Sequence, residues 1–95
     1  MVIGILKIQM HLGEGHSLKE KRKVVKSLVG KVRSRFNTAI AEVGENDKWQ
    51  LIELGLTTVG NDKRHVDSSL SNILNFIDSL YLAEIIDTKM EFINV

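Results

Sequence analysis

The stretch SLKEKRKVVKSLVGKVRSRF, residues 17–36, decides the fold because it contains both a helix start and a long helical pattern. Ser17 and Glu20 match a capping box: the Ser17 hydroxyl accepts from the N–H of Glu20, and the Glu20 carboxylate accepts from the N–H of Ser17. Apolar residues at helical spacing then form one stripe, which consists of Leu18, Val25, Leu28, Val29, Val32 and Phe36. The sequence predicts a helix that stops near Asn37, with Gly30 as an interior cost of about 1 kcal/mol.

A strand precedes this helix. Residues 2–12 alternate with a period of two, which is typical of a strand with one buried face. The set expected to face the core is Val2, Leu6, Ile8, Met10 and Leu12. The opposite set is Ile3, Ile5, Lys7, Gln9 and His11. Gly13-Glu14-Gly15 breaks the alternation and predicts a loop.

Three further elements follow the helix. Residues 38–44 and 49–59 predict two strands, and the short polar turn between them indicates an antiparallel hairpin. Asn61 or Asp62 is suited to cap a second helix. The buried stripe of that helix is expected to be Val66, Leu70, Ile73, Leu74 and Ile77. Residues 85–93 predict a last strand, whose core-facing residues are expected to be Ile86, Met90 and Phe92.

The order of these elements over residues 1–95 is β-α-β-β-α-β, and the length is that of one domain. Two right-handed crossovers around a hairpin predict an α+β ferredoxin-like sandwich: a four-stranded antiparallel sheet with both helices on one face. The other face is then uncovered. Besides the second residue set of the first strand, it should display Trp49, Leu51, Glu53, Asp87, Lys89 and Glu91.

Composition narrows the classes of function. The chain has no cysteine, which excludes disulfides and thiolate metal sites and fits a reducing cytoplasm. The apolar residues 1–6 are too short for a signal peptide or a membrane span. The net charge is only +1, yet residues 19–35 hold eight basic residues and one acid, against five basic and eleven acidic residues elsewhere. The charge is therefore strongly polarised along the chain.

Residues 16–27, HSLKEKRKVVKS, resemble the YlxP-like family, a bacterial domain of unknown function. Further agreement, over nearly the whole chain, lies in Arg35-Phe36-Asn37, Ala41-Glu42-Val43, Trp49-Gln50, Glu53-Leu54-Gly55 and Gly60-Asn61-Asp62. The resemblance implies a ferredoxin-like fold. It also implies an RNA or ribosome setting, because genes of the family often lie near those of translation and ribosome-maturation factors. It brings no catalytic residue.

The basic helix is the first functional candidate, because Lys and Arg side chains can contact the phosphates of RNA or of the ribosome. The expected nucleic-acid-binding residues are Lys19, Lys21, Arg22, Lys23, Lys26, Lys31, Arg33 and Arg35. The alternative is an ordinary solvated helix face, since both residue types are good helix formers whose stems cover apolar surface. Glu partners four residues away, which would support that alternative, are missing.

The uncovered sheet face is the second candidate. Ile3, Ile5, Trp49 and Leu51 form an expected apolar patch, which predicts a homodimer or another protein partner. The alternative is that long side chains or the turn before Trp49 cover this patch. Stacking of RNA bases on the face is not expected, because the basic and aromatic pattern of such sheets is absent.

His16 and Ser17 form a third candidate, an anion site at the helix N-terminus. Acylphosphatases share this topology and bind phosphate at the equivalent loop, which raises the alternative of a small acyl or phosphate hydrolase. The chain has no arginine between Met1 and Lys21, so a purely structural cap is favoured. The histidines, His11, His16 and His65, show no metal-binding spacing. We expect no catalytic residue, no cofactor and no metal.

Overall fold

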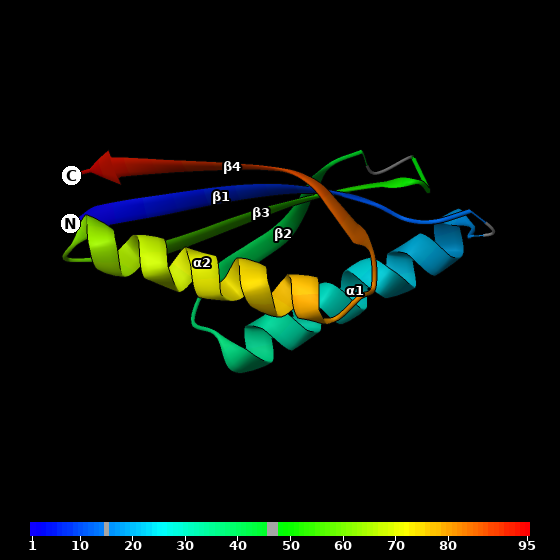
Figure 1. Cartoon of the computed structure of the whole chain (residues 1–95), viewed down its shortest axis with the longest axis horizontal. Helices are drawn as coiled ribbons and strands as arrows, with labels where there is room; N and C mark the ends of the chain where they lie inside the picture. Colours follow the sequence, from blue (N-terminus) through cyan, green and yellow to red (C-terminus); the bar gives the residue numbers. More distant parts are fainter. Residues whose placement is uncertain (15, 46–47) are drawn as a thin grey trace.

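The computed structural model describes residues 1–14, 16–45 and 48–95. Its elements, in chain order, are β1 (Val2–His11), α1 (Leu18–Arg35), β2 (Ala39–Gly44), β3 (Leu51–Gly60), α2 (Lys63–Ser79) and β4 (Glu84–Asn94) (Figure 1). The predicted order and the type of every element are confirmed. The bounds of the strands lie within two residues of the predicted ones.

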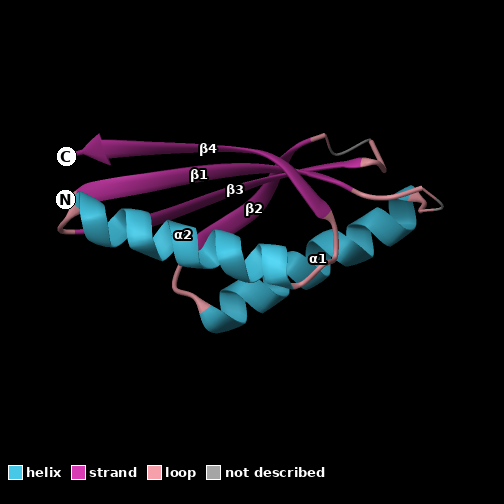
Figure 2. Cartoon of the chain, viewed as in Figure 1, coloured by secondary structure: helices cyan, strands magenta, loops and turns pink. Residues whose placement is uncertain are grey.

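The four strands form one sheet in the order β2-β3-β1-β4. Every neighbouring pair is antiparallel, and β1 lies between β3 and β4. Both helices lie on the same side of this sheet (Figure 2). The predicted ferredoxin-like sandwich is therefore confirmed, and no helix among the described residues lies on the opposite face of the sheet.

The core lies between the helices and the sheet. The predicted core set of β1 is buried in full. The other strands and the helices add Ile40, Ile52, Leu54, Leu56, Leu28, Val32, Val66, Leu70, Ile73 and Ile77. Helix α2 approaches β1 closely at Gly4, where an added Cβ would lie 2.4 Å from Cγ1 of Val66 and 2.8 Å from Cδ1 of Leu70. A glycine fits this close approach, because a Cβ would overlap the side chains of Val66 and Leu70.

Two expected placements are wrong. Trp49 lies in a turn before β3, so it is not a strand residue as predicted. In β4, Ile86 was expected to face the core, but Ile85 packs there and Ile86 is exposed. The cause is a register shift in the β1–β4 pairing between Gln9 and Met10. A shift of one residue moves a side chain to the other face of a strand.

Candidate nucleic-acid interface

Helix α1 begins at the predicted cap, but only one of the two predicted capping hydrogen bonds is present among the described residues, because the Glu20 carboxylate contacts His16 instead of the N–H of Ser17. The Ser17 hydroxyl accepts a hydrogen bond from the N–H of Glu20 at 3.2 Å, which satisfies one of the free donors at the helix N-terminus. The helix ends at Arg35, and the N–H of Phe36 donates to the carbonyl of Val32. These two ends fix the direction of the helix and the faces on which its cations lie.

Four exposed cations share the outer face of α1. Lys19, Arg22, Lys23 and Lys26 are spaced i, i+3, i+4 and i+7, so they lie on one side of the helix over about 10 Å of its length. We call these four residues the basic stripe. None of them forms an ion pair with a carboxylate in the part of the chain that the structure describes. Their charges are therefore available to an external anion.

The three cations near the helix end differ from the basic stripe. Lys31 is exposed but lies on the flank of α1 away from Arg22. Arg33 donates from Nη2 to the carbonyl of Ile40 in β2 at 3.1 Å. The guanidinium of Arg35 lies 4.8 Å from the ring centroid of Phe76 in α2, a cation–π contact. The eight predicted contacts therefore do not form one surface.

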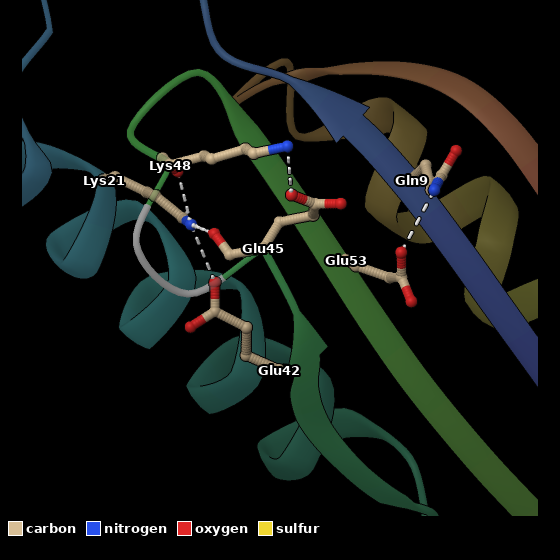
Figure 3. Close-up of polar contacts among 6 residues, drawn as sticks. All are labelled: Gln9, Lys21, Glu42, Glu45, Lys48 and Glu53. Carbon is tan, nitrogen blue, oxygen red and sulfur yellow. Dashed lines mark hydrogen bonds and ion pairs between the residues drawn. The ribbon is translucent and has the colours of Figure 1, made fainter.

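Lys21 is a correction to the sequence prediction. It was expected to contact phosphates, but only 1% of its side chain is exposed. Figure 3 shows the ammonium pointing towards β2 and the start of β3, away from the outer face of α1. It donates to the carbonyls of Glu45 and Lys48, the second at 2.6 Å. A buried ammonium with these partners cannot reach a ligand outside the protein.

The third partner of Lys21 is an acid. Its Nζ lies 3.1 Å from Oε2 of Glu42, whose side chain is 22% exposed. That oxygen is buried and accepts no hydrogen bond from the described residues, so the ammonium is its electrostatic partner. Lys48 in turn places its own Nζ 3.1 Å from Oε2 of Glu45 (Figure 3). Together these contacts fasten α1 to both ends of the β2–β3 connection.

A sequence signal for Lys21 existed. Its position falls on the apolar stripe, because Leu18, Lys21, Val25 and Leu28 follow the spacing 3, 4, 3. Glu42 lies two residues after the core residue Ile40 in β2, so the two side chains share the face that points towards the helices. A lone cation on a buried stripe and a lone acid on the facing strand indicate a partly buried pair.

The helix start has the contacts of a structural cap, the interpretation that the sequence favours over an anion site at His16 and Ser17. The Ser17 hydroxyl is already used by the cap. Nδ1 of His16 lies 3.1 Å from Oε2 of Glu20, which places a carboxylate beside the ring. This carboxylate would repel a bound anion.

The uncovered sheet face is apolar at one end and polar in the middle. Ile3 pairs with Val59 on β3 and with Ile93 on β4, and the last two are 61% and 45% exposed. In the middle, Glu53 accepts a hydrogen bond from Gln9 at 3.0 Å and lies 3.7 Å from Nζ of Lys7. Ile3, Ile5, Trp49 and Leu51, the predicted patch, are all half-buried.

Residues 1–14, 16–45 and 48–95 contain neither a metal-binding cluster nor a membrane-spanning helix. No group of three or more His, Asp or Glu residues there could hold a metal ion. No helix in these ranges is long and apolar enough to cross a membrane.

Comparisons with known proteins identify a family and a relative of this chain. A family model described as "Protein of unknown function (DUF503)" matches residues 3–90. The uncharacterized protein YlxP of Bacillus subtilis (strain 168) is 33% identical over 91 residues, which cover 96% of this chain and 99% of that protein.

Two solved structures share the fold. The structural-genomics protein YJCS superposes with a TM-score of 0.57 at 11% identity, covering 97% of this chain and 99% of that one. The de novo designed protein Foldit4 gives 0.51 at 12% identity, covering 99% and 97%. Likeness to a designed protein shows that this fold can exist without a natural function. The shared fold does not indicate the function of this chain, which depends on its own surface residues.

Proposed function

We propose that this chain, which belongs to the DUF503 family of proteins of unknown function, is a non-catalytic RNA- or ribosome-associated module of the cytoplasm. It contacts phosphates through the basic stripe of α1. The single observation that carries the proposal is the exposure of Lys19, Arg22, Lys23 and Lys26 on one helix face without an ion-pair partner among the described residues.

The positions of the other cations support this choice. Arg33 and Arg35 each have a partner inside the protein, and the side chain of Lys21 is buried on the inner face of α1. If the basic residues served only to solubilise the helix, local partners should be as common on its outer face as on its flanks. Instead, four of the five α1 cations without a partner among the described residues lie on one face, with Lys31 on the flank as the exception. A strand of phosphates could contact several of the four at once.

Binding that is strongly sensitive to salt is the test of this function. Phosphate contacts release counterions, so the affinity for RNA should fall steeply as the salt concentration rises. The affinity should depend little on the RNA sequence. Replacing Arg22, Lys23 and Lys26 by Gln should remove most of the binding and leave the fold intact, because all three side chains are exposed. Absence of RNA binding even at low salt would refute the proposal.

A second candidate function is self-association through the uncovered sheet face. Its support is the apolar row formed by Val59, Ile3 and Ile93 across three neighbouring strands, in which Val59 and Ile93 are exposed and Ile3 is half-buried. β-Branched residues in such a row can be buried against a second copy. A change in molecular mass on introducing a charge at Val59 tests it.

A further inference from the structure

A cleft of about 480 Å³ lies at the end of β1 that leads towards α1. We call it the end cleft. Its described lining includes His11, His16, Asp78, Tyr81 and Glu84. The cleft therefore joins three parts of the chain: the end of β1, the start of α1 and the connection between α2 and β4. Its volume is within the range of small-ligand sites.

Tyr81 in this lining has two unusual properties. Its side chain is 90% exposed, and its backbone has φ of 52°, in the left-handed region. It follows the last residues of α2, where its N–H approaches the carbonyl of Asp78 at 3.4 Å. Helices commonly end with a glycine in this conformation, since a Cβ is disfavoured there. Because Tyr81 is 90% exposed, the fold gains little burial from it that would offset this cost, and a ligand contact would account for the residue.

The chemistry of the end cleft suits a flat, neutral ring better than a phosphate. Asp78 and Glu84 place carboxylates in the lining, and they would repel a phosphate. Three of the lining residues, Tyr81, His11 and His16, carry aromatic rings, and the exposed ring of Tyr81 is accessible to an aromatic ligand. Proteins that bind single-stranded RNA hold unpaired bases on such rings.

The end cleft lies at the helix end where the basic stripe begins. His16 lines the cleft, and Lys19, the first cation of the stripe, follows it by three residues. A single strand with its phosphates along α1 would therefore bring an unpaired base to the cleft. We infer that the end cleft holds an unpaired nucleobase, stacked on Tyr81, of an RNA strand bound along the basic stripe. This inference rests on the proposed function and specifies the form of RNA that the protein prefers.

The test compares Tyr81→Gly and Tyr81→Phe with the unaltered protein. Fluorescence anisotropy would measure binding to a ten-residue oligoadenylate and to a blunt ten-base-pair RNA duplex. Loss of one stacked base should weaken oligoadenylate binding about tenfold in Tyr81→Gly. Duplex binding should stay within about twofold, because a paired base cannot enter the cleft. Tyr81→Phe should bind both probes as the unaltered protein does.

Thermal unfolding separates a binding role from a structural one. Tyr81→Gly should raise Tm by about 5 °C, because glycine adopts the left-handed conformation without strain. A variant that is more stable but binds oligoadenylate less tightly supports the inference. Unchanged oligoadenylate binding in Tyr81→Gly would overturn it and leave the proposed function standing. If the unaltered protein binds neither probe, both fail.

Discussion

The ammonium of Lys21 lies 3.1 Å from the carboxylate of Glu42, so the most deeply buried cation of α1 pairs with an acid of β2. The same ammonium donates to two backbone carbonyls beyond β2. Lys21 is thus part of the fold, whereas the four cations of the basic stripe are exposed and have no ion-pair partner among the described residues.

Replacing Lys21 by Met should destabilise the protein by about 3 kcal/mol, because it leaves the Glu42 carboxylate and two carbonyls without their partner. Urea unfolding measures this loss. Lys23→Met is the matched control, since the same substitution on the exposed face should change stability by less than about 0.5 kcal/mol. Equal stabilities for the two variants would contradict the buried placement of Lys21.

A double-mutant cycle should show that Lys21 and Glu42 interact directly. Glu42→Gln alone leaves a buried ammonium beside a neutral side chain, which is unfavourable. In the double variant, Lys21→Met with Glu42→Gln, the two losses should be less than additive by about 2 kcal/mol. Additive losses in urea unfolding would mean that the two side chains contribute independently.

Gly30→Ala should stabilise the protein by about 1 kcal/mol. An added Cβ at Gly30 meets no atom within 4 Å, and alanine has the higher helix propensity. Gly4→Ala is the contrasting variant and should lose about 2 kcal/mol, because its Cβ would overlap Val66 and Leu70 of α2. Chemical denaturation of both variants measures the difference. A destabilised Gly30→Ala would indicate that another surface lies against this part of α1.

Val59→Lys tests self-association through the uncovered sheet face. If two copies bury the row of Val59, Ile3 and Ile93, a charge in this row should produce monomers. Light scattering should then give the mass of two chains for the unaltered protein and of one for the variant. Lys89→Gln, on the same face but in its polar middle, serves as the control. The mass of a single chain for the unaltered protein would rule out this interface.

The elements could be predicted from the sequence because each follows from a local pattern. Alternation in residues 2–12 and the cap at Ser17 depend only on near neighbours in the chain. The exposure of Ile86 could not be predicted in this way, because it results from a bulge in the pairing of β4 with β1. Strand register is a property of two chain segments and is poorly encoded in either alone.

The candidate site was predictable in part. Charge counting located α1, but it assigned Lys21 to the same surface as Lys23, although helical spacing separates them. The carbonyl partners of Lys21 depend on the path of the chain after β2, which composition does not specify. The end cleft was not predicted, because Tyr81 carries no signal of its left-handed backbone and such positions usually hold Gly or Asn.

The most direct test of the basic stripe is the salt dependence of oligoadenylate binding by three proteins. For four phosphate contacts with a single strand, the logarithm of affinity should fall against the logarithm of salt with a slope of about −3. A variant with Arg22, Lys23 and Lys26 changed to Gln should have a slope of about −0.7, since one contact remains. A variant with Lys63, Arg64 and Lys89 changed to Gln loses the same charge elsewhere and should keep the original slope. Equal slopes for the two variants would contradict the assignment of binding to α1.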